Sequence, residues 1–220
     1  MRTIMSVGRA ALAAALICGF LSSGSGCIGL ASHLLYVIKG EKVPAEFEGL
    51  EGKRVAVVCM SGSLGSDPGS ATATLARLVE VQLKRNVPKI ELVRQQDIAN
   101  WIDNNDWDRL SYRDIGRGVR ADIVLAIELD GYRLHEDQTM YKGRTKWAVT
   151  VYDMRQGGEV LFSKKEPNFE FPINGGQHVS ETTEEAFQKL FLTVLSHEVS
   201  KWFYAYEFKE DFARDALIAR

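Results

Sequence analysis

The N-terminus is the feature that most constrains which part of this chain can fold as a globular domain. Arg2 and Arg9 precede an apolar run from Ala10 to Leu21, and small residues then lead to Cys27. A basic start, a short apolar run and a small-residue exit are the three parts of a bacterial export signal. The cysteine at its end indicates a lipoprotein signal. We therefore expect residues 1–26 to be removed and Cys27 to carry a lipid such as palmitate.

A second interpretation of the N-terminus is an uncleaved membrane anchor. Apolar residues resume after Cys27, so the stretch from Ala10 to Ile38 exceeds the roughly 20 apolar residues that a membrane-spanning helix needs. The basic residues before it would stay in the cytoplasm and place the following domain outside. Both interpretations predict a membrane-anchored, extracytoplasmic protein. Because Ile28 is not the aspartate that retains enterobacterial lipoproteins at the inner membrane, the lipoprotein interpretation favours the periplasmic face of the outer membrane.

Length and charge limit the fold and the partners of the mature chain. Of the 220 residues, the 194 that remain from Cys27 onward suffice for one domain with its own core. Removing Arg2 and Arg9 leaves 25 Lys and Arg against 29 Asp and Glu, a formal charge of −4. This balance disfavours nucleic acid as a partner. A lipid would block Cys27 and leave Cys59 as the one free thiol, which excludes a disulfide scaffold; Cys59 lies in an apolar run and is expected to be buried.

Apolar periodicity predicts an α/β fold. The valine-rich run Arg54–Met60 is typical of a strand covered on both faces, and Ser70 can cap a helix whose apolar residues recur at helical spacing. The patterns together predict a small mixed sheet of about five strands with helices packed on it, in the order β-α-β-α-α-β-β-β-α with a long C-terminal helix. The expected strands are 54–60, 89–93, 121–134, 142–154 and 159–165, and the expected helices are 70–85, 95–102, 111–118 and 182–206. We expect a Thr182–Glu185 capping box to open the last helix and the Gly157–Gly158 pair to turn a hairpin.

These elements divide the chain into four expected parts. They are a signal peptide (1–26), a lipidated or membrane-proximal segment with a polar linker (27–52), an α/β domain (53–206) and an amphipathic C-terminal extension (207–220).

No local motif predicts a cofactor or a metal ion. The glycine- and serine-rich loop 61–69 lacks the Lys-Ser/Thr ending of a phosphate-binding P-loop. The acidic turn 103–108 lacks the Gly and Glu that an EF-hand requires. His197 resembles the start of a zinc-binding helix, but Lys201 stands where the second histidine would be. We therefore expect no cofactor and no metal site.

Histidines leave one catalytic alternative open. His135, Glu136 and Asp137 are adjacent in a loop between two expected strands, but neighbouring strand residues point to opposite faces and converge poorly. No nucleophile elbow is present. We expect no catalytic residues, and a hydrolase site assembled in space from His135, His178 or His197 remains the alternative.

Aromatic residues near the C-terminus are the candidate partner-binding residues. Tryptophan and tyrosine are enriched where proteins bind one another. The candidates are Trp202, Tyr206, Phe208 and Phe212. The alternative is that these side chains complete the core.

Three segments resemble those of a known domain family. They are Lys53–Val58, Arg120–Ile127, and Trp147–Asp153 with the Gly157–Gly158 turn. Their order resembles the anticodon-binding-like α/β domain of bacterial envelope lipoproteins, which includes CsgG-type curli-secretion lipoproteins, penicillin-binding-protein activator lipoproteins and the N-terminal domain of TolB. The resemblance spans residues 53–206 and implies a binding or assembly module tethered to a membrane. The connection 135–142 is too short for a curli-type pore insertion, so channel activity is not implied.

The sequence therefore predicts a non-enzymatic, membrane-anchored protein of the cell envelope that binds another protein. Its membrane contact would be the lipid on Cys27 or the apolar segment after it. An envelope protein is the expected partner, and a homo-oligomer remains open. The alternatives are an auxiliary component of an envelope transporter and the hydrolase considered above.

Overall fold

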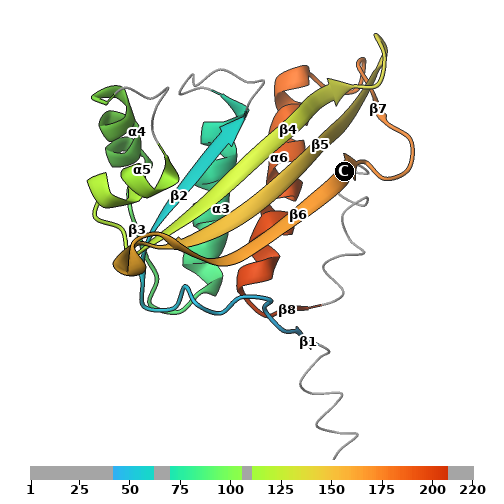
Figure 1. Ribbon diagram of the computed structural model, residues 1–220. Helices are drawn as coiled ribbons and strands as arrows, with labels where there is room; N and C mark the ends of the chain where they lie inside the picture. The colour runs from blue at the N-terminus through green and yellow to red at the C-terminus, as the bar shows by residue number, and fades with distance from the viewer. Residues whose placement is uncertain (1–41, 62–69, 106–110, 208–220) are drawn as a thin grey trace, which may run out of the picture. The chain divides into compact units, whose positions relative to one another are not determined.

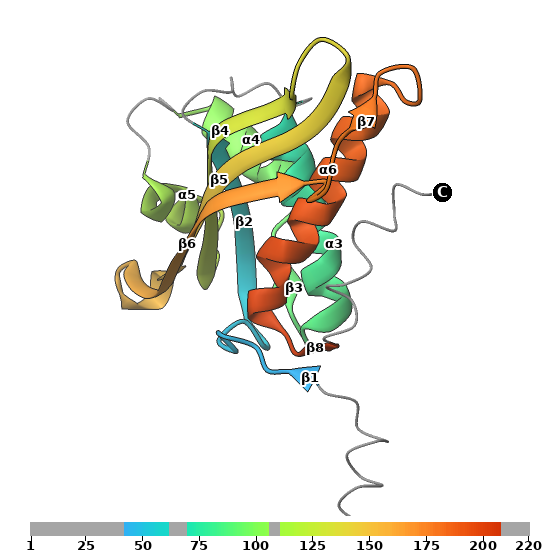
Figure 2. The ribbon, with the colours of Figure 1, turned by 90° about the vertical axis from the view of Figure 1, so that its right-hand side faces the viewer.

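The fold is a mixed β-sheet with helices on both faces (Figures 1 and 2). The computed structural model describes residues 42–61, 70–105 and 111–207. From Val43 onward these residues belong to one compact unit. Within the described parts of the chain, no helix combines the length and hydrophobicity needed to cross a bilayer.

The order of the main elements is the predicted one. The strands are β1 (Lys42–Val43), β2 (Arg54–Ser61), β3 (Glu91–Leu92), β4 (Ile123–His135), β5 (Met140–Asp153), β6 (Glu159–Phe171), β7 (Gln177–His178) and β8 (Tyr206–Glu207). The helices are α3 (Ala71–Asn86), α4 (Gln95–Asp103), α5 (Tyr112–Gly118) and α6 (Glu184–Ser200), with 3₁₀ turns η2 (Met154–Gln156) and η3 (Lys201–Phe203). The predicted α/β class is confirmed.

The main sheet has the strand order β3-β2-β4-β5-β6, and β7 pairs with the end of β5. β2 runs parallel to β3 and β4, whereas β4, β5 and β6 form an antiparallel meander. β1 and β8 form a second, two-stranded sheet. The parallel half requires helical crossovers between its strands, and α3, α4 and α5 supply them.

Two apolar clusters pack against opposite faces of the sheet. The larger lies between the sheet and helices α3 and α6, and it contains Val55 and Val57 of β2. The smaller lies beneath α4 and α5 and contains Ala56 and Val58. Because successive strand residues point to opposite faces, a strand that is covered on both sides needs this continuous apolar run. Cys59 packs at the border of the larger cluster, and burial raises the pKa of its thiol, so it remains protonated.

Three helix starts have side-chain caps. The Ser70 hydroxyl accepts a hydrogen bond from Ala73 N, as predicted. Ser111 and Asp114 form a complete capping box at the start of α5. The predicted cap of the last helix is wrong by one residue, because Thr183 rather than Thr182 caps α6 and accepts from Ala186 N.

The end of α6 also differs from the prediction. The α-helix stops at Ser200 instead of continuing to Tyr206, and a 3₁₀ turn brings Trp202 and Phe203 into the core. No glycine or proline marks this end. The packing of Trp202 sets it.

Two strands differ in length from the prediction. β6 continues past Lys165 and Pro167 to Phe171, because Phe169 and Phe171 pair with β5 and are buried. A proline is compatible with this position because β6 is an edge strand. β3 is shorter than the predicted 89–93, and only its residues 91 and 92 pair with β2.

A glutamine side chain closes the edge of β2 beyond β3. Gln95 Nε2 donates to the carbonyl of Val57 at 2.9 Å and to Glu80 Oε1 at 2.6 Å. The glutamine thus replaces the next strand hydrogen bond and links α3 to α4. Burial raises the pKa of Glu80 to about 7, while the Gln95 hydrogen bond and the charge of Arg77 oppose this shift.

The Glu80 carboxyl is expected to make stability depend on pH. Its pKa is higher in the folded state, so its protonation stabilises the fold fully below the ordinary value of 4.5, and this contribution is lost as pH rises through about 7. Glu80→Gln should therefore be more stable than the wild type at pH 8 and closer to it at pH 4.5. Urea unfolding across this range measures the difference. Glu159→Gln, at an exposed position, controls for the loss of one charge, and equal curves for the two variants would contradict the assignment.

Candidate functional site

The predicted site residues fall into two groups. Cys27, Phe208 and Phe212 lie outside the described residues. Tyr206 belongs to β8, which pairs with β1 at the end of the domain where the chain enters, and Trp202 lies in η3, just before it (Figure 1). Trp202 is only 5% exposed, whereas Tyr206 is half-buried.

Trp202 is the centre of an aromatic cluster. Its indole stacks on Trp147 with ring centroids 4.4 Å apart, and it meets Phe162 in a T-shaped arrangement with ring centroids 6.2 Å apart. The Lys164 ammonium lies 4.4 Å from the Trp202 ring centroid, close enough for a cation–π interaction. Most of the indole surface is therefore used within the domain, and Tyr206 is the more accessible of the two described candidates.

The segment that enters the domain, residues 43–50, packs on this aromatic cluster and is hydrogen-bonded to it. The backbone N–H groups of Glu46 and Phe47 both donate to the carbonyl of Trp202 at 2.9 Å. Lys164 Nζ donates to the two carboxylate oxygens of Glu46 at 2.6 and 2.8 Å. Phe47 packs on Phe162 and Phe203, and Leu50 is fully buried. The core thus includes residues of the predicted linker.

His135, Glu136 and Asp137 of the β4–β5 hairpin do not converge on one point. His135 Nε2 lies 3.2 Å from Glu184 of α6, Glu136 pairs with Arg144, and the Asp137 carboxylate accepts hydrogen bonds from Thr139. Among the described residues, no group of three or more His, Cys, Asp or Glu side chains could hold a metal ion.

The other two histidines have separate surroundings. His178 Nδ1 lies 2.7 Å from the Ser180 hydroxyl, and His197 Nε2 lies 3.0 Å from Gln82 on α3. His197 is thirteen residues along α6 from the glutamate that His135 contacts, which is roughly 20 Å at the rise of an α-helix. His197 therefore does not share a site with His135, whereas His178 pairs with Met140 beside the β4–β5 hairpin that carries His135.

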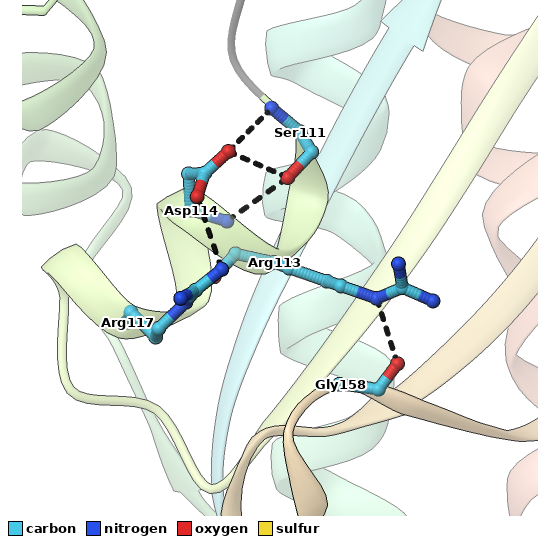
Figure 3. Close-up of polar contacts among 5 residues, drawn as sticks. All are labelled: Ser111, Arg113, Asp114, Arg117 and Gly158. Atoms are coloured by element: carbon cyan, nitrogen blue, oxygen red, sulfur yellow. Dashed lines mark hydrogen bonds and ion pairs between the residues drawn. The ribbon is translucent and has the colours of Figure 1, made fainter.

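A polar corner lies where α5 meets the turn between β5 and β6 (Figure 3). Asp114 Oδ2 accepts from both the backbone N–H and the hydroxyl of Ser111, and Asp114 Oδ1 pairs with Arg117 at 3.1 Å. The Ser111 hydrogen bonds hold the pKa of Asp114 below its ordinary value. The capping box fixes the first turn of α5 and, with it, the position of Arg113.

Arg113 connects α5 to the hairpin. Its Nε donates to the carbonyl of Gly158 at 2.8 Å (Figure 3). Its guanidinium carbon lies 5.6 Å from the ring centroid of Tyr152. Tyr152 in turn stacks on Tyr112 at 6.0 Å. Burial, together with the nearby Glu128, raises the pKa of Tyr112, so its phenol stays protonated. Sequence reasoning did not identify this corner, because its members lie up to 47 residues apart, from Ser111 to Gly158, and share no motif.

The comparisons with known proteins concern the fold. No protein-family model matches the sequence, and no curated protein matches it. A PelC dodecamer from Paraburkholderia phytofirmans matches with a TM-score of 0.46 and 12% identity, over 74% of this chain and 97% of that chain. Lipoprotein GNA1162 from Neisseria meningitidis matches with a TM-score of 0.42 and 12% identity, over 66% and 96%.

A third match is the LpoB C-terminal domain from Salmonella enterica, with a TM-score of 0.36 and 19% identity, over 60% of this chain and 89% of that chain. Solved lipoproteins are therefore among the structures that this chain resembles, as the sequence pattern predicts. The likeness is one of fold alone, and no activity or partner follows from it.

Proposed function

We propose that this chain is a lipid-anchored envelope protein whose α/β domain binds another protein and performs no catalysis. The N-terminal signal places the domain outside the cytoplasm, with Cys27 as the lipidated residue. The periplasmic face of the outer membrane is the proposed location.

The attachment of segment 43–50 is the observation that carries this proposal. Leu50, Phe47 and the Glu46–Lys164 ion pair fix the connecting chain to the domain, so an anchor that precedes this segment would hold the domain from its first residues onward. A lipid on Cys27, with the apolar residues that follow it, would supply the two membrane signals that stable anchoring generally needs.

The surface chemistry is consistent with binding rather than turnover. Burial raises the pKa of the Cys59 thiol, so this thiol is not an activated nucleophile. His197 lies thirteen residues along α6 from the glutamate that His135 contacts, so these two histidines do not share one site. Tyr206, which is half-buried at the entry end, is the more accessible aromatic candidate for a partner, whereas Trp202 is buried.

Replacement of Cys27 tests the anchor. In cells fed a fatty-acid analogue, the wild type is expected to incorporate the label and to sediment with membranes. Cys27→Ser should incorporate none, whereas Cys59→Ser is the matched control and should retain full labelling. An unlabelled wild type that still sediments with membranes would contradict lipidation and identify the segment as an uncleaved anchor. Recovery of no specific envelope protein on crosslinking would count against the binding function.

A further inference from the structure

The guanidinium of Arg113 forms no ion pair with the described residues around it. The next arginine on α5, Arg117, pairs with Asp114 at 3.1 Å, and Arg155 after β5 lies 3.7 Å from Asp153. The one hydrogen bond of the Arg113 side chain to the described residues is made by Nε (Figure 3). Its two Nη atoms have no hydrogen-bond or ion-pair partner among the described residues.

The guanidinium of Arg113 is held in a defined position. A Cβ atom built on Gly158 would lie 2.6 Å from Arg113 Cδ and Cγ, so the side chain can lie across this residue because it is a glycine. The hydrogen bond to the Gly158 carbonyl and the face of Tyr152 restrain it from two sides. Such restraint lowers the entropy lost on binding. The free Nη atoms form the planar fork that matches a carboxylate.

Two exposed apolar residues of β6 lie across the β5–β6 ladder from Tyr152, the ring that Arg113 faces. Val160 pairs with Tyr152 across the β5–β6 ladder and is 46% exposed. Leu161, the additional residue of the bulge between this pair and Val151–Phe162, is 40% exposed. Arginine and tyrosine are two of the residue types enriched in protein-binding hot spots.

We propose that Arg113 binds a carboxylate on an acidic segment of a partner protein, while Tyr152, Val160 and Leu161 contact an apolar side chain beside that carboxylate. This proposal rests on the proposed function and names the binding surface and its chemistry. A protein is favoured over a lipid surface because Arg117 and Arg155, the basic residues near Arg113, are already paired with acids, whereas membrane-binding segments carry about 4–8 basic residues.

Photo-crosslinking in cells tests this surface on the full chain. A photoreactive phenylalanine derivative replaces Leu161, and the same derivative at Val81 of α3, which is 61% exposed, is the position control. Only the Leu161 position is expected to give a discrete protein adduct. Mass spectrometry should place the crosslink within a few residues of an aspartate, a glutamate or a C-terminal carboxylate.

Variants of the arginine then test the fork. Arg113→Gln should lower the adduct yield at least about tenfold, since a charged bidentate contact is lost. Arg117→Gln, one turn along the same helix, should leave it within about twofold of the parent, because that charge is already paired. Gly158→Ala keeps the arginine but displaces it, so the yield should also fall. Thermal melting of each variant shows whether a lower adduct yield comes from lost binding or from unfolding of the protein.

Several outcomes would overturn the proposal. They are equal crosslinking from Val81 and Leu161, a yield that does not respond to Arg113→Gln in a folded protein, an adduct with lipid, and an adduct with a second copy of this chain. Membrane sedimentation of the same samples keeps the proposed function separate. A protein that remains anchored but gives no acidic adduct refutes this surface alone, whereas loss of sedimentation in the parent refutes the anchor.

Discussion

Trp202→Ala is expected to lower the free energy of unfolding by roughly 3–5 kcal/mol, the usual cost of removing a large buried aromatic side chain. The indole is 5% exposed and stacks on Trp147, with Phe162 and Lys164 completing its surroundings. The backbone carbonyl of Trp202 also accepts two hydrogen bonds from segment 43–50. The cavity left by the missing indole would therefore lie beneath the place where this segment is attached. Urea unfolding followed by circular dichroism measures the loss of stability, provided that the dependence of the unfolding free energy on urea concentration (the m-value) is unchanged.

Tyr206→Ala is the matched comparison for Trp202→Ala. Tyr206 is half-buried, and the Lys201 ammonium lies 5.5 Å from its ring centroid, a contact worth about 1 kcal/mol or less at such a position. If Tyr206→Ala weakens partner binding while the fold remains stable, the entry end is an interface. A Trp202→Ala protein that is as stable as the wild type would show instead that the indole is not part of the core.

Local patterns were sufficient to predict most of the elements. The valine run of β2 and the Ser70 cap of α3 are local signals, because each determines the conformation of residues next to it in the sequence. Both are in the structure as predicted. The same is true of the Ser111 start of α5 and of the hairpin turn at Gly157 and Gly158, which both have positive φ. Glycine adopts this conformation without the penalty that other residues incur.

The errors occurred where tertiary packing decides. Two adjacent threonines can each cap a helix, and Glu185 three residues after Thr182 favoured the wrong one. α6 ends where Trp202 turns into the core, which no local breaker announces. β6 extends past Pro167 because Phe169 and Phe171 pack on the larger cluster.

The candidate surfaces depended even more on long-range contacts. The aromatic character of Trp202 was visible in the sequence, but its burial follows from Trp147, which is 55 residues away. Arg113 has no distinguishing neighbour in the sequence. Its position depends on Tyr152 and Gly158, which only the fold brings to it.

Gly143→Val is expected to lower the free energy of unfolding by about 3 kcal/mol, at the upper end of the usual cost of overpacking. Gly143 lies in β5 beneath α6, and a Cβ atom there would be 2.1 Å from Cδ2 of Phe191. Phe191 is fully buried and cannot move aside easily, because the rings of Tyr132 and Phe169 lie 5.7 and 5.8 Å from its own. The helix must therefore shift away from the sheet, which a lower melting temperature would report.

A double-mutant cycle with Phe191→Ala identifies the cause of this effect. Phe191→Ala alone should cost roughly 3–5 kcal/mol through the cavity it leaves. In the double variant the valine fills part of that cavity, so the combined loss should fall short of the sum by about 0.5–3 kcal/mol. Gly131→Ala is the control, since φ there is +63° and nothing lies within 4 Å of the added Cβ. Its cost of about 1–2 kcal/mol comes from the backbone, so Phe191→Ala should add to it without rescue. Additivity at Gly143 as well would contradict a direct clash with Phe191 and would leave backbone conformation as the reason for glycine in β5.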